Sequence, residues 1–199
     1  MDSTALIVQV PEAEHLVQPF REHFDSSAPQ GMPAHITILY PCLPAHDLTP
    51  ENTASLRRLF AQVPCFSAVL MEPRAFPGCP RTLYLAPVPI IPFSEMTYAV
   101  QRLFPAYPPY GGVHVGVFPH LTVAQSLDPV VFDQVAARFC RHTRRQLPMP
   151  ITVTEVSLWN HTSGRWTLHT RFPLQRPSLQ IQPQSQAHLP MNSKNSSRK

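Results

Sequence analysis

Two short stretches, HITI at residues 35–38 and HLTV at residues 120–123, share one pattern: a histidine and a threonine two residues apart, with apolar residues between and after them. In a β-strand, side chains two residues apart point to the same face of the sheet. Each stretch therefore predicts a strand that presents an imidazole and a hydroxyl on one face and buries aliphatic side chains on the other. Two such strands, placed side by side, would gather two histidines and two hydroxyls in one small volume.

The order of predicted elements repeats along the chain. Apolar spacing predicts strand, helix, motif strand, helix and strand in each half. These elements are residues 4–10, 16–24, 35–40, 50–63 and 66–71, then 82–86, 92–104, 118–125, 129–139 and 151–159, with a Ser163-Gly164 turn and a strand at 166–172. The motif histidines are 85 residues apart (120 − 35), and the strands that begin at residues 66 and 151 have the same spacing (151 − 66).

This spacing predicts an internal duplication of architecture within one domain. We place that domain at residues 1–175 and its two lobes at about residues 1–75 and 76–175, with elements free to exchange between them. A pseudo-twofold arrangement of the lobes would bring both motif strands to a common cleft.

The net charge of +4 comes from basic residues at the C-terminal end of the chain. Four basic residues and no acidic residue lie in the segment 176–199, so residues 1–175 are formally neutral (4 − 4). This basic tail is rich in Gln, Ser, Pro and Asn, and we expect it to be disordered. A neutral domain does not indicate a uniformly basic surface for nucleic acid.

Lysine and cysteine usage exclude several kinds of site. Both lysines lie in the tail, which excludes a P-loop lysine, a Schiff-base lysine and the covalent lysine of ATP-dependent ligases from residues 1–175. The four cysteines are scattered without a CxxC pair, so they indicate neither a zinc site nor a disulfide framework, and a reducing cytoplasm is the expected location. No apolar run is long enough to span a membrane, and the N-terminus does not read as a signal peptide.

Two histidines and two hydroxyls suit acid–base chemistry on a phosphodiester, and they need no metal ion. One neutral imidazole can accept a proton from the attacking oxygen while one imidazolium donates a proton to the leaving oxygen. Threonine hydroxyls can donate to the non-bridging oxygens as charge develops. We therefore predict His35, Thr37, His120 and Thr122 as the catalytic residues, acting on a 2′,3′-cyclic phosphate or a 2′-5′ phosphodiester.

The segments MPAHITILYP (32–41) and FPHLTVA (118–124) resemble the two signature motifs of the 2H phosphoesterase superfamily, and the first is similar to its 2′-5′ RNA ligase-like branch. The closing stretch, residues 155–174, resembles the C-terminal hairpin of that branch. The resemblance covers about residues 4–174. It implies a bilobal α+β fold with concave antiparallel sheets flanked by helices, and a site without metal or cofactor. It also implies a phosphoric diester hydrolase, while leaving the substrate and the direction of reaction open.

Two other function classes stay open at this point. A nucleotide- or RNA-binding module without turnover would carry nearly the same site, and a turnover assay separates it from an enzyme. A metal-dependent hydrolase would use some of the ten histidines, but the chain has no HExxH motif and no carboxylate beside the motif histidines. Activity that does not depend on trace metal would distinguish the two-histidine enzyme from a metal-dependent hydrolase.

Several residues outside the motifs also have predicted places. Tyr40 is a candidate for substrate binding, through stacking on a base. We expect Trp159 and Trp166 to pack within the sheet, and His161 and His169 to lie on the surface of the closing hairpin. The expected partner is a nucleotide or RNA-end substrate, and we expect a monomer that does not bind membranes.

Overall fold

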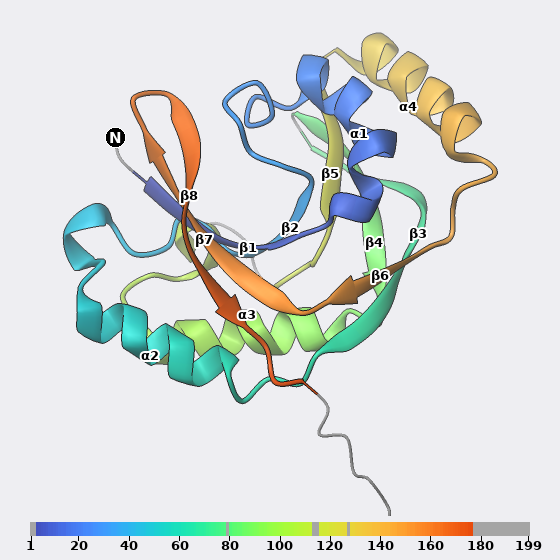
Figure 1. The fold of residues 1–199 in the computed structure, drawn as a ribbon. Helices are drawn as coiled ribbons and strands as arrows, with labels where there is room; N and C mark the ends of the chain where they lie inside the picture. The colour runs from blue at the N-terminus through green and yellow to red at the C-terminus, as the bar shows by residue number, and fades with distance from the viewer. Residues whose placement is uncertain (1–2, 79, 113–115, 127, 177–199) are drawn as a thin grey trace, which may run out of the picture.

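The computed structural model describes residues 3–78, 80–112, 116–126 and 128–176, and its strands form an eight-stranded antiparallel sheet. The strand order is β6-β3-β4-β5-β2-β1-β7-β8. The strands are β1 Ser3–Gln9, β2 His35–Leu39, β3 Phe66–Phe76, β4 Arg81–Val88, β5 Leu121–Ser126, β6 Met149–Val153, β7 Glu155–Thr162 and β8 Arg165–Pro173. The sheet is curled, so that one of its faces is concave (Figure 1).

Each of the four helices has a proline in its first turn, where the missing backbone N–H costs no hydrogen bond. They are α1 Pro11–Phe24, α2 Pro50–Phe60, α3 Ile91–Leu103 and α4 Pro129–Thr143, and short 3₁₀ turns lie at Ala45–Asp47 and Pro109–Gly112. Thr49 caps α2 by accepting the Asn52 N–H, and the Asp128 carboxylate caps α4. Within the described part of the chain, no helix is long and apolar enough to cross a membrane.

The helices pack in two pairs against the convex face of the sheet (Figure 1). Helices α1 and α4 contact each other and β5, whereas α3 contacts α2 and β2. The main core fills the space between these helices and the sheet, and it includes the fully buried Ile36 and Leu121 of the motif strands. Burying these alternate residues leaves the residues between them on the concave face.

The predicted α+β class, with a concave antiparallel sheet flanked by helices, is confirmed. From edge to centre the two halves of the sheet run β6-β3-β4-β5 and β8-β7-β1-β2, so they meet at the two motif strands. Strand β3 pairs with β4, although the predicted boundary between the lobes separates them. The lobes at residues 1–75 and 76–175 stay a prediction, and the tail lies outside the described residues from residue 177 onward.

The single strand predicted at 151–159 is two strands in the structure. Strand β6 pairs with β3, whereas β7 pairs with β1, so the chain passes from one half of the sheet to the other at Thr154. Apolar alternation carries no signal for such a change of partner. The Ser163-Gly164 turn is confirmed, and its two positive φ angles, 53° and 75°, suit the twist of a two-residue hairpin loop.

Candidate active site

The two motif strands meet at the centre of the sheet. They are antiparallel, with Ile36 directly opposite Leu121. Extending this register by one residue in each direction sets His35 beside Thr122 and His120 beside Thr37 on the concave face. The fold thus brings the four predicted catalytic residues to one patch. His120 immediately precedes β5, whereas His35 is the first residue of β2.

The two imidazoles are held in the same way. The Nδ1–H of His35 donates to the carbonyl of Pro33 at 2.7 Å, and that of His120 donates to the carbonyl of Phe118 at 2.6 Å. A carbonyl can only accept, so Nδ1 carries a hydrogen in both rings. In each half-buried ring, Nε2 is therefore the nitrogen that can exchange a proton with a substrate.

Both histidines favour the neutral form in the free protein. Burial, with the positive charge of the Arg21 guanidinium acting in the same direction, lowers the pKa of His35 to about 4. Burial also lowers the pKa of His120, and the hydrogen bond to Phe118 opposes that shift in part. An anion bound between the two rings would raise both pKa values, because it stabilises the protonated imidazole.

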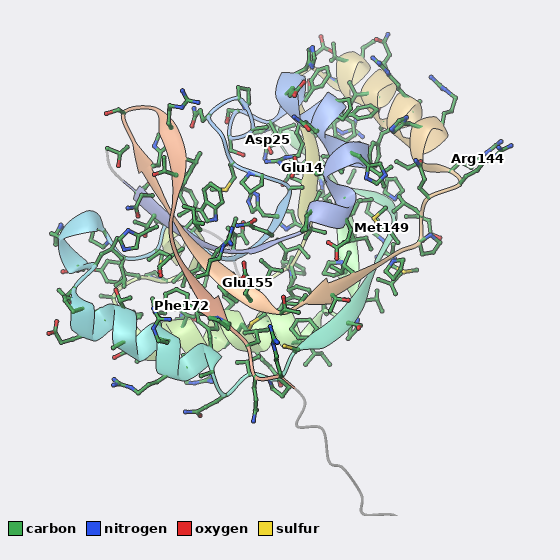
Figure 2. The ribbon with its side chains drawn as sticks, viewed as in Figure 1. Glu14, Asp25, Arg144, Met149, Glu155 and Phe172 are labelled. Atoms are coloured by element: carbon green, nitrogen blue, oxygen red, sulfur yellow. The ribbon has the colours of Figure 1, made fainter. Side chains whose placement is uncertain are left out.

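A buried cation lies behind His35. Arg21 on α1 is only 1% exposed; its Nε donates to Asp25 at 2.9 Å and its Nη2 donates to the carbonyl of Met32 at 3.0 Å. Glu14 lies 3.8 Å from Nη1, and Figure 2 shows Glu14 and Asp25 close together. Asp25 also accepts the backbone N–H and hydroxyl of Ser27. These bonds fix the shape of the connection at residues 25–32, which leads to the first motif.

Aromatic side chains from β3 and β4 flank the second histidine. The ring of Phe76 lies edge-on to His120 with centroids 5.0 Å apart, and Tyr84 lies 5.6 Å from the same imidazole. Phe76 and Tyr84 stack on each other at 4.0 Å. Phe118, whose carbonyl fixes His120, is 59% exposed. The imidazole of His120 is thus held against an aromatic wall, with an exposed ring beside it.

Gln125 lies on the concave face, together with Thr122. Simple alternation along β5 would place the two side chains on different faces of the sheet, because they are three residues apart. The register of β4 and β5 shifts by one residue, with Tyr84 opposite Thr122 but Leu83 opposite Ala124. This bulge returns Gln125 to the face of the histidines, where its amide donates to Thr82 at 3.4 Å. Nothing in the local sequence distinguishes a bulge at this point from a regular strand.

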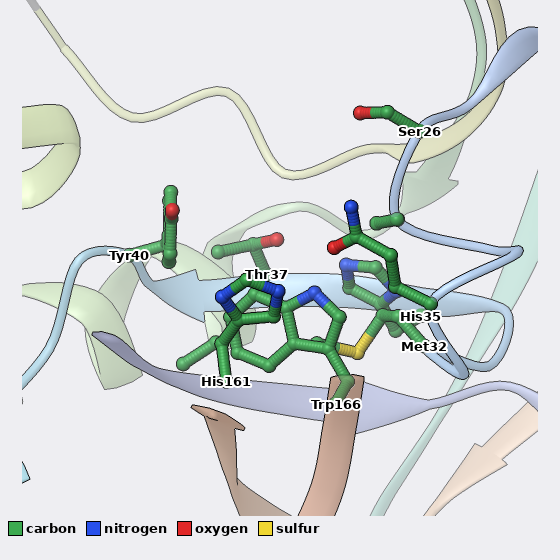
Figure 3. Close-up of a pocket in the computed structure, with 10 residues that line it drawn as sticks. Ser26, Met32, His35, Thr37, Tyr40, His161 and Trp166 are labelled. Carbon is green, nitrogen blue, oxygen red and sulfur yellow. The ribbon is translucent and has the colours of Figure 1, made fainter. Parts of the chain in front are cut away.

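A cavity of about 250 Å³ opens beside His35 and Thr37, on the side away from the aromatic wall. Its lining comes from β1, from the connection at residues 25–32, and from the hairpin of β7 and β8. Tyr40, the predicted substrate-binding residue, lines the cavity and is 40% exposed. Figure 3 shows Tyr40 and His35 at opposite ends of the view, with Thr37 between them.

The hairpin contributes residues that the sequence did not place here. Trp159 and Trp166 pack, as expected, against a small apolar cluster of Ala5, Ile7 and Met32, but Trp166 also lines the cavity. His161, expected at the surface, is half-buried and lines the cavity as well. It points inward because the pairing of β1 with β7 sets it opposite Ser3, on the same face as Trp159. His169 is exposed, as expected.

The described residues contain no group of three or more His, Cys, Asp or Glu side chains placed to hold a metal ion. The Arg21 guanidinium and the Asp25 carboxylate both act on His35 electrostatically, in opposite directions. The arrangement offers two proton-exchanging nitrogens and two hydroxyls on one concave patch, with a cavity on one side and an aromatic wall on the other.

Comparison with known proteins adds a family and a fold. Residues 9–165 match the family model described as 2′-5′ RNA ligase superfamily. No curated protein sequence gives a significant match. Among solved structures, LigT of E. coli complexed with 3′-AMP has a TM-score of 0.55 at 16% identity, and TT0787 of Thermus thermophilus has 0.53 at 18%. Both comparisons cover 87% of this chain and 98% of the other. At this level of identity the likeness concerns the fold.

Proposed function

The chain belongs to the 2′-5′ RNA ligase superfamily, and on this premise we propose that it is a metal-independent phosphoesterase. Its substrate would be a nucleotide or RNA end with a 2′,3′-cyclic phosphate, or a 2′-5′ phosphodiester. The observation that carries the proposal is the matched pair of imidazoles, each held through Nδ1 and each beside the threonine of the other strand. Such a pair fits a reaction that needs one proton acceptor and one proton donor.

The proposed reaction is an in-line displacement at phosphorus. A water oxygen attacks phosphorus as the neutral imidazole takes its proton at Nε2. The bond between phosphorus and the ester oxygen on the opposite side breaks, and the second imidazole, protonated at the start, gives its Nε2 proton to that oxygen. The products are a phosphomonoester and a free hydroxyl. The hydroxyls of Thr37 and Thr122 donate to the non-bridging oxygens, where negative charge increases.

Two further observations support a nucleotide substrate. The crystal structures with a similar fold include LigT of E. coli complexed with 3′-AMP and with NADP+, at TM-scores of 0.55 and 0.51. In this chain, aromatic rings lie on both sides of the histidine pair, with Tyr40 and Trp166 on one side and Phe118 on the other. Aromatic faces of this kind stack on bases of any sequence.

The proposal is tested by incubating the purified protein, with EDTA present, with a panel of phosphodiesters. The panel contains the four 2′,3′-cyclic nucleotides, 2′-5′ dinucleotides and ADP-ribose 1″,2″-cyclic phosphate. We expect turnover of at least one of them to a phosphomonoester. Binding without turnover of any member would favour the nucleotide-binding module and would overturn the assignment as an enzyme.

Removal of metal ions should leave the rate of turnover unchanged. Neither motif supplies a carboxylate of the kind that phosphate-processing metal sites use. The measurement compares kcat before and after dialysis against EDTA. Loss of activity that Mn²⁺ or Zn²⁺ restores would rule out the proposed mechanism.

Replacement of either threonine by valine should lower kcat by about 10- to 10³-fold, because each change removes one donor to the charged transition state. The matched variants Thr37→Ser and Thr122→Ser keep the hydroxyl, and we expect them to stay within a few-fold of the parent. Equal losses in the valine and serine variants would mean that the hydroxyls do not act as donors.

A further inference from the structure

The backbone just before the first motif is held by two charged residues of α1. The Nη2 of Arg21 donates to the carbonyl of Met32 at 3.0 Å. The carboxylate of Glu14 accepts the backbone N–H of Ala34 at 2.7 Å. Both bonds end on the residues that flank Pro33, so α1 holds the chain on each side of this proline.

Pro33 sets the orientation of the His35 imidazole. Its carbonyl accepts the Nδ1–H of His35 at 2.7 Å, which leaves Nε2 to exchange a proton with a substrate. Proline has no backbone N–H, and the carbonyl of Pro33 is already used by the imidazole. Other bonds can therefore anchor this point of the chain only through the neighbouring residues, and those are the residues that Arg21 and Glu14 hold.

The second motif repeats the carbonyl contact in different electrostatic surroundings. The Nδ1–H of His120 donates to the carbonyl of Phe118 at 2.6 Å, as in the first motif. Within the described part of the chain, no charged side chain contributes to the pKa of His120, which burial lowers and the bond to Phe118 raises. The two histidines are thus held alike, but only His35 lies in the field of a permanent cation.

The burial of Arg21 is not explained by stability alone. Its side chain is 1% exposed, and a guanidinium stays protonated even when it is buried. Nη1 is buried without a hydrogen bond to any described residue, and the Oε1 of Glu14 is 3.8 Å away. A buried ion pair is often no more stabilising than apolar residues of similar volume, and incompletely paired charges are concentrated at functional sites.

The charged and titratable side chains around His35 are Glu14, Arg21, Asp25, Tyr40, His120 and His161. Burial is the main reason that the pKa of His35 is lowered; Arg21 and His120 act in the same direction, whereas Asp25 opposes them. Of these groups, only Arg21 is positively charged at every pH at which the protein is folded. Arg21 therefore favours the neutral form of His35 throughout the pH range of an assay.

We propose that Arg21 is a positioning residue of the two-histidine site, which together with Glu14 holds the backbone of residues 32–34 and thereby orients the His35 imidazole and keeps it ready to accept a proton. The inference rests on the proposed function, which supplies the reaction. In that reaction His35 takes the proton of the attacking water, and His120 gives a proton to the leaving oxygen. Arg21 and Glu14 act through His35 and do not contact the substrate.

The first arm of the test replaces Glu14, whose side chain is one-third exposed, so the fold should survive. Glu14→Ala removes the acceptor of the Ala34 N–H, and kcat should fall by up to about 100-fold with little change in KM, because the imidazole loses its alignment. Glu14→Gln keeps an oxygen acceptor and should stay within a few-fold of the parent. Glu22→Ala is the matched control: Glu22 is exposed on the same helix, bonded to Gln18, and its removal should leave the kinetics unchanged.

The second arm measures the pH dependence of Arg21→Met, below its unfolding temperature and with EDTA present. Loss of the positive charge should raise the pKa of His35, so kcat/KM should fall more at pH 5 than at pH 8. A purely structural role would lower kcat/KM by the same factor at both pH values. If His35 were the proton donor, kcat/KM at pH 5 would fall less than at pH 8. Arg21→Lys keeps the charge but not the planar fork, so it should restore the pH dependence without restoring kcat.

An NMR titration of the His35 ring gives a readout that needs no turnover. The midpoint should lie at higher pH in Arg21→Met than in the parent and should return toward the parent's value in Arg21→Lys. If Arg21→Met leaves this titration unchanged, or if Glu14→Ala keeps the kcat of the parent, the positioning role is wrong and the phosphoesterase stands. If the parent turns over no phosphodiester of the panel, the proposed function falls, and this inference falls with it.

Discussion

The variants His35→Ala and His120→Ala should each lose about 10²–10⁴ in kcat on any phosphodiester that the parent turns over. This is the usual contribution of a general acid or base, and each variant lacks one of the two. The double variant should lose less than the product of the two single losses, because the imidazoles act as a unit in one displacement. Steady-state rates of the parent, both single variants and the double variant measure this directly.

Two controls make this result specific to the site. His169→Ala changes an exposed histidine of β8 and should leave kcat unchanged. Thermal melting of all variants should show that the fold is intact. If both single variants kept rates close to that of the parent, the site would lie elsewhere and the two motifs would be ordinary strand sequence.

Arg21→Met should lower the free energy of unfolding by about 3–5 kcal/mol, because it leaves the carboxylate of Asp25 buried without its cation. For a chain of this size the midpoint of thermal unfolding, Tm, would fall by about 6–20 °C. Adding Asp25→Asn to Arg21→Met should recover part of the loss, since the unpaired charge is then gone. Arg58→Met is the matched control on α2: Arg58 is exposed, with a hydrogen bond to Ser55, and its effect should stay within about 0.5 kcal/mol.

The buried ion pair of Arg21 and Asp25 also predicts that the protein loses stability in acid. Burial tends to raise the pKa of Asp25, but the Arg21 charge and the hydrogen bonds from Ser27 more than offset it, so the pKa lies below its ordinary value of 3.8. A carboxyl group with a lowered pKa stabilises the fold above that ordinary value, and its contribution is lost as the pH falls through the lowered pKa. Arg21→Met should lack this acid-dependent part of the unfolding curve. An Arg21→Met variant as stable as the parent would show that the network carries no stability.

Local sequence patterns predicted much of the fold. Alternation within HITI and HLTV predicted which side chains face the helices. Ile36 and Leu121 are buried on that face of the sheet, as expected. The Ser163-Gly164 turn follows from two residues that tolerate positive φ. Each of these features depends on a few neighbouring residues, which is why a single sequence is sufficient to predict it.

Features that depend on pairing between distant segments could not be predicted from local sequence patterns. The inward position of His161 depends on the register between β1 and β7, and that of Gln125 on a bulge between β4 and β5. Arg21 follows Phe20 on α1, and the acidic residue four positions later, Asp25, is its ion-pair partner. The burial of Arg21 follows from the connection at residues 25–32, whose Met32 carbonyl accepts a hydrogen bond from it. His161 lines the cavity beside His35, and Arg21 acts on His35 electrostatically, so the sequence pattern predicted the two motif strands but not the residues that pack around them.

The account is tested most directly by the dependence of kcat/KM on pH for a 2′,3′-cyclic nucleotide, measured in EDTA from about pH 4 to about pH 9. One imidazole must be neutral and the other protonated, so the profile should be bell-shaped, with limbs that belong to the coupled pair. Because the pKa values of His35 and His120 are both lowered in the free protein, the maximum should lie below about pH 6.5. The profile of kcat should be displaced to higher pH, since bound phosphate raises both pKa values. A rate that rises steadily into alkaline pH, or that requires an added metal ion, would contradict the two-histidine mechanism.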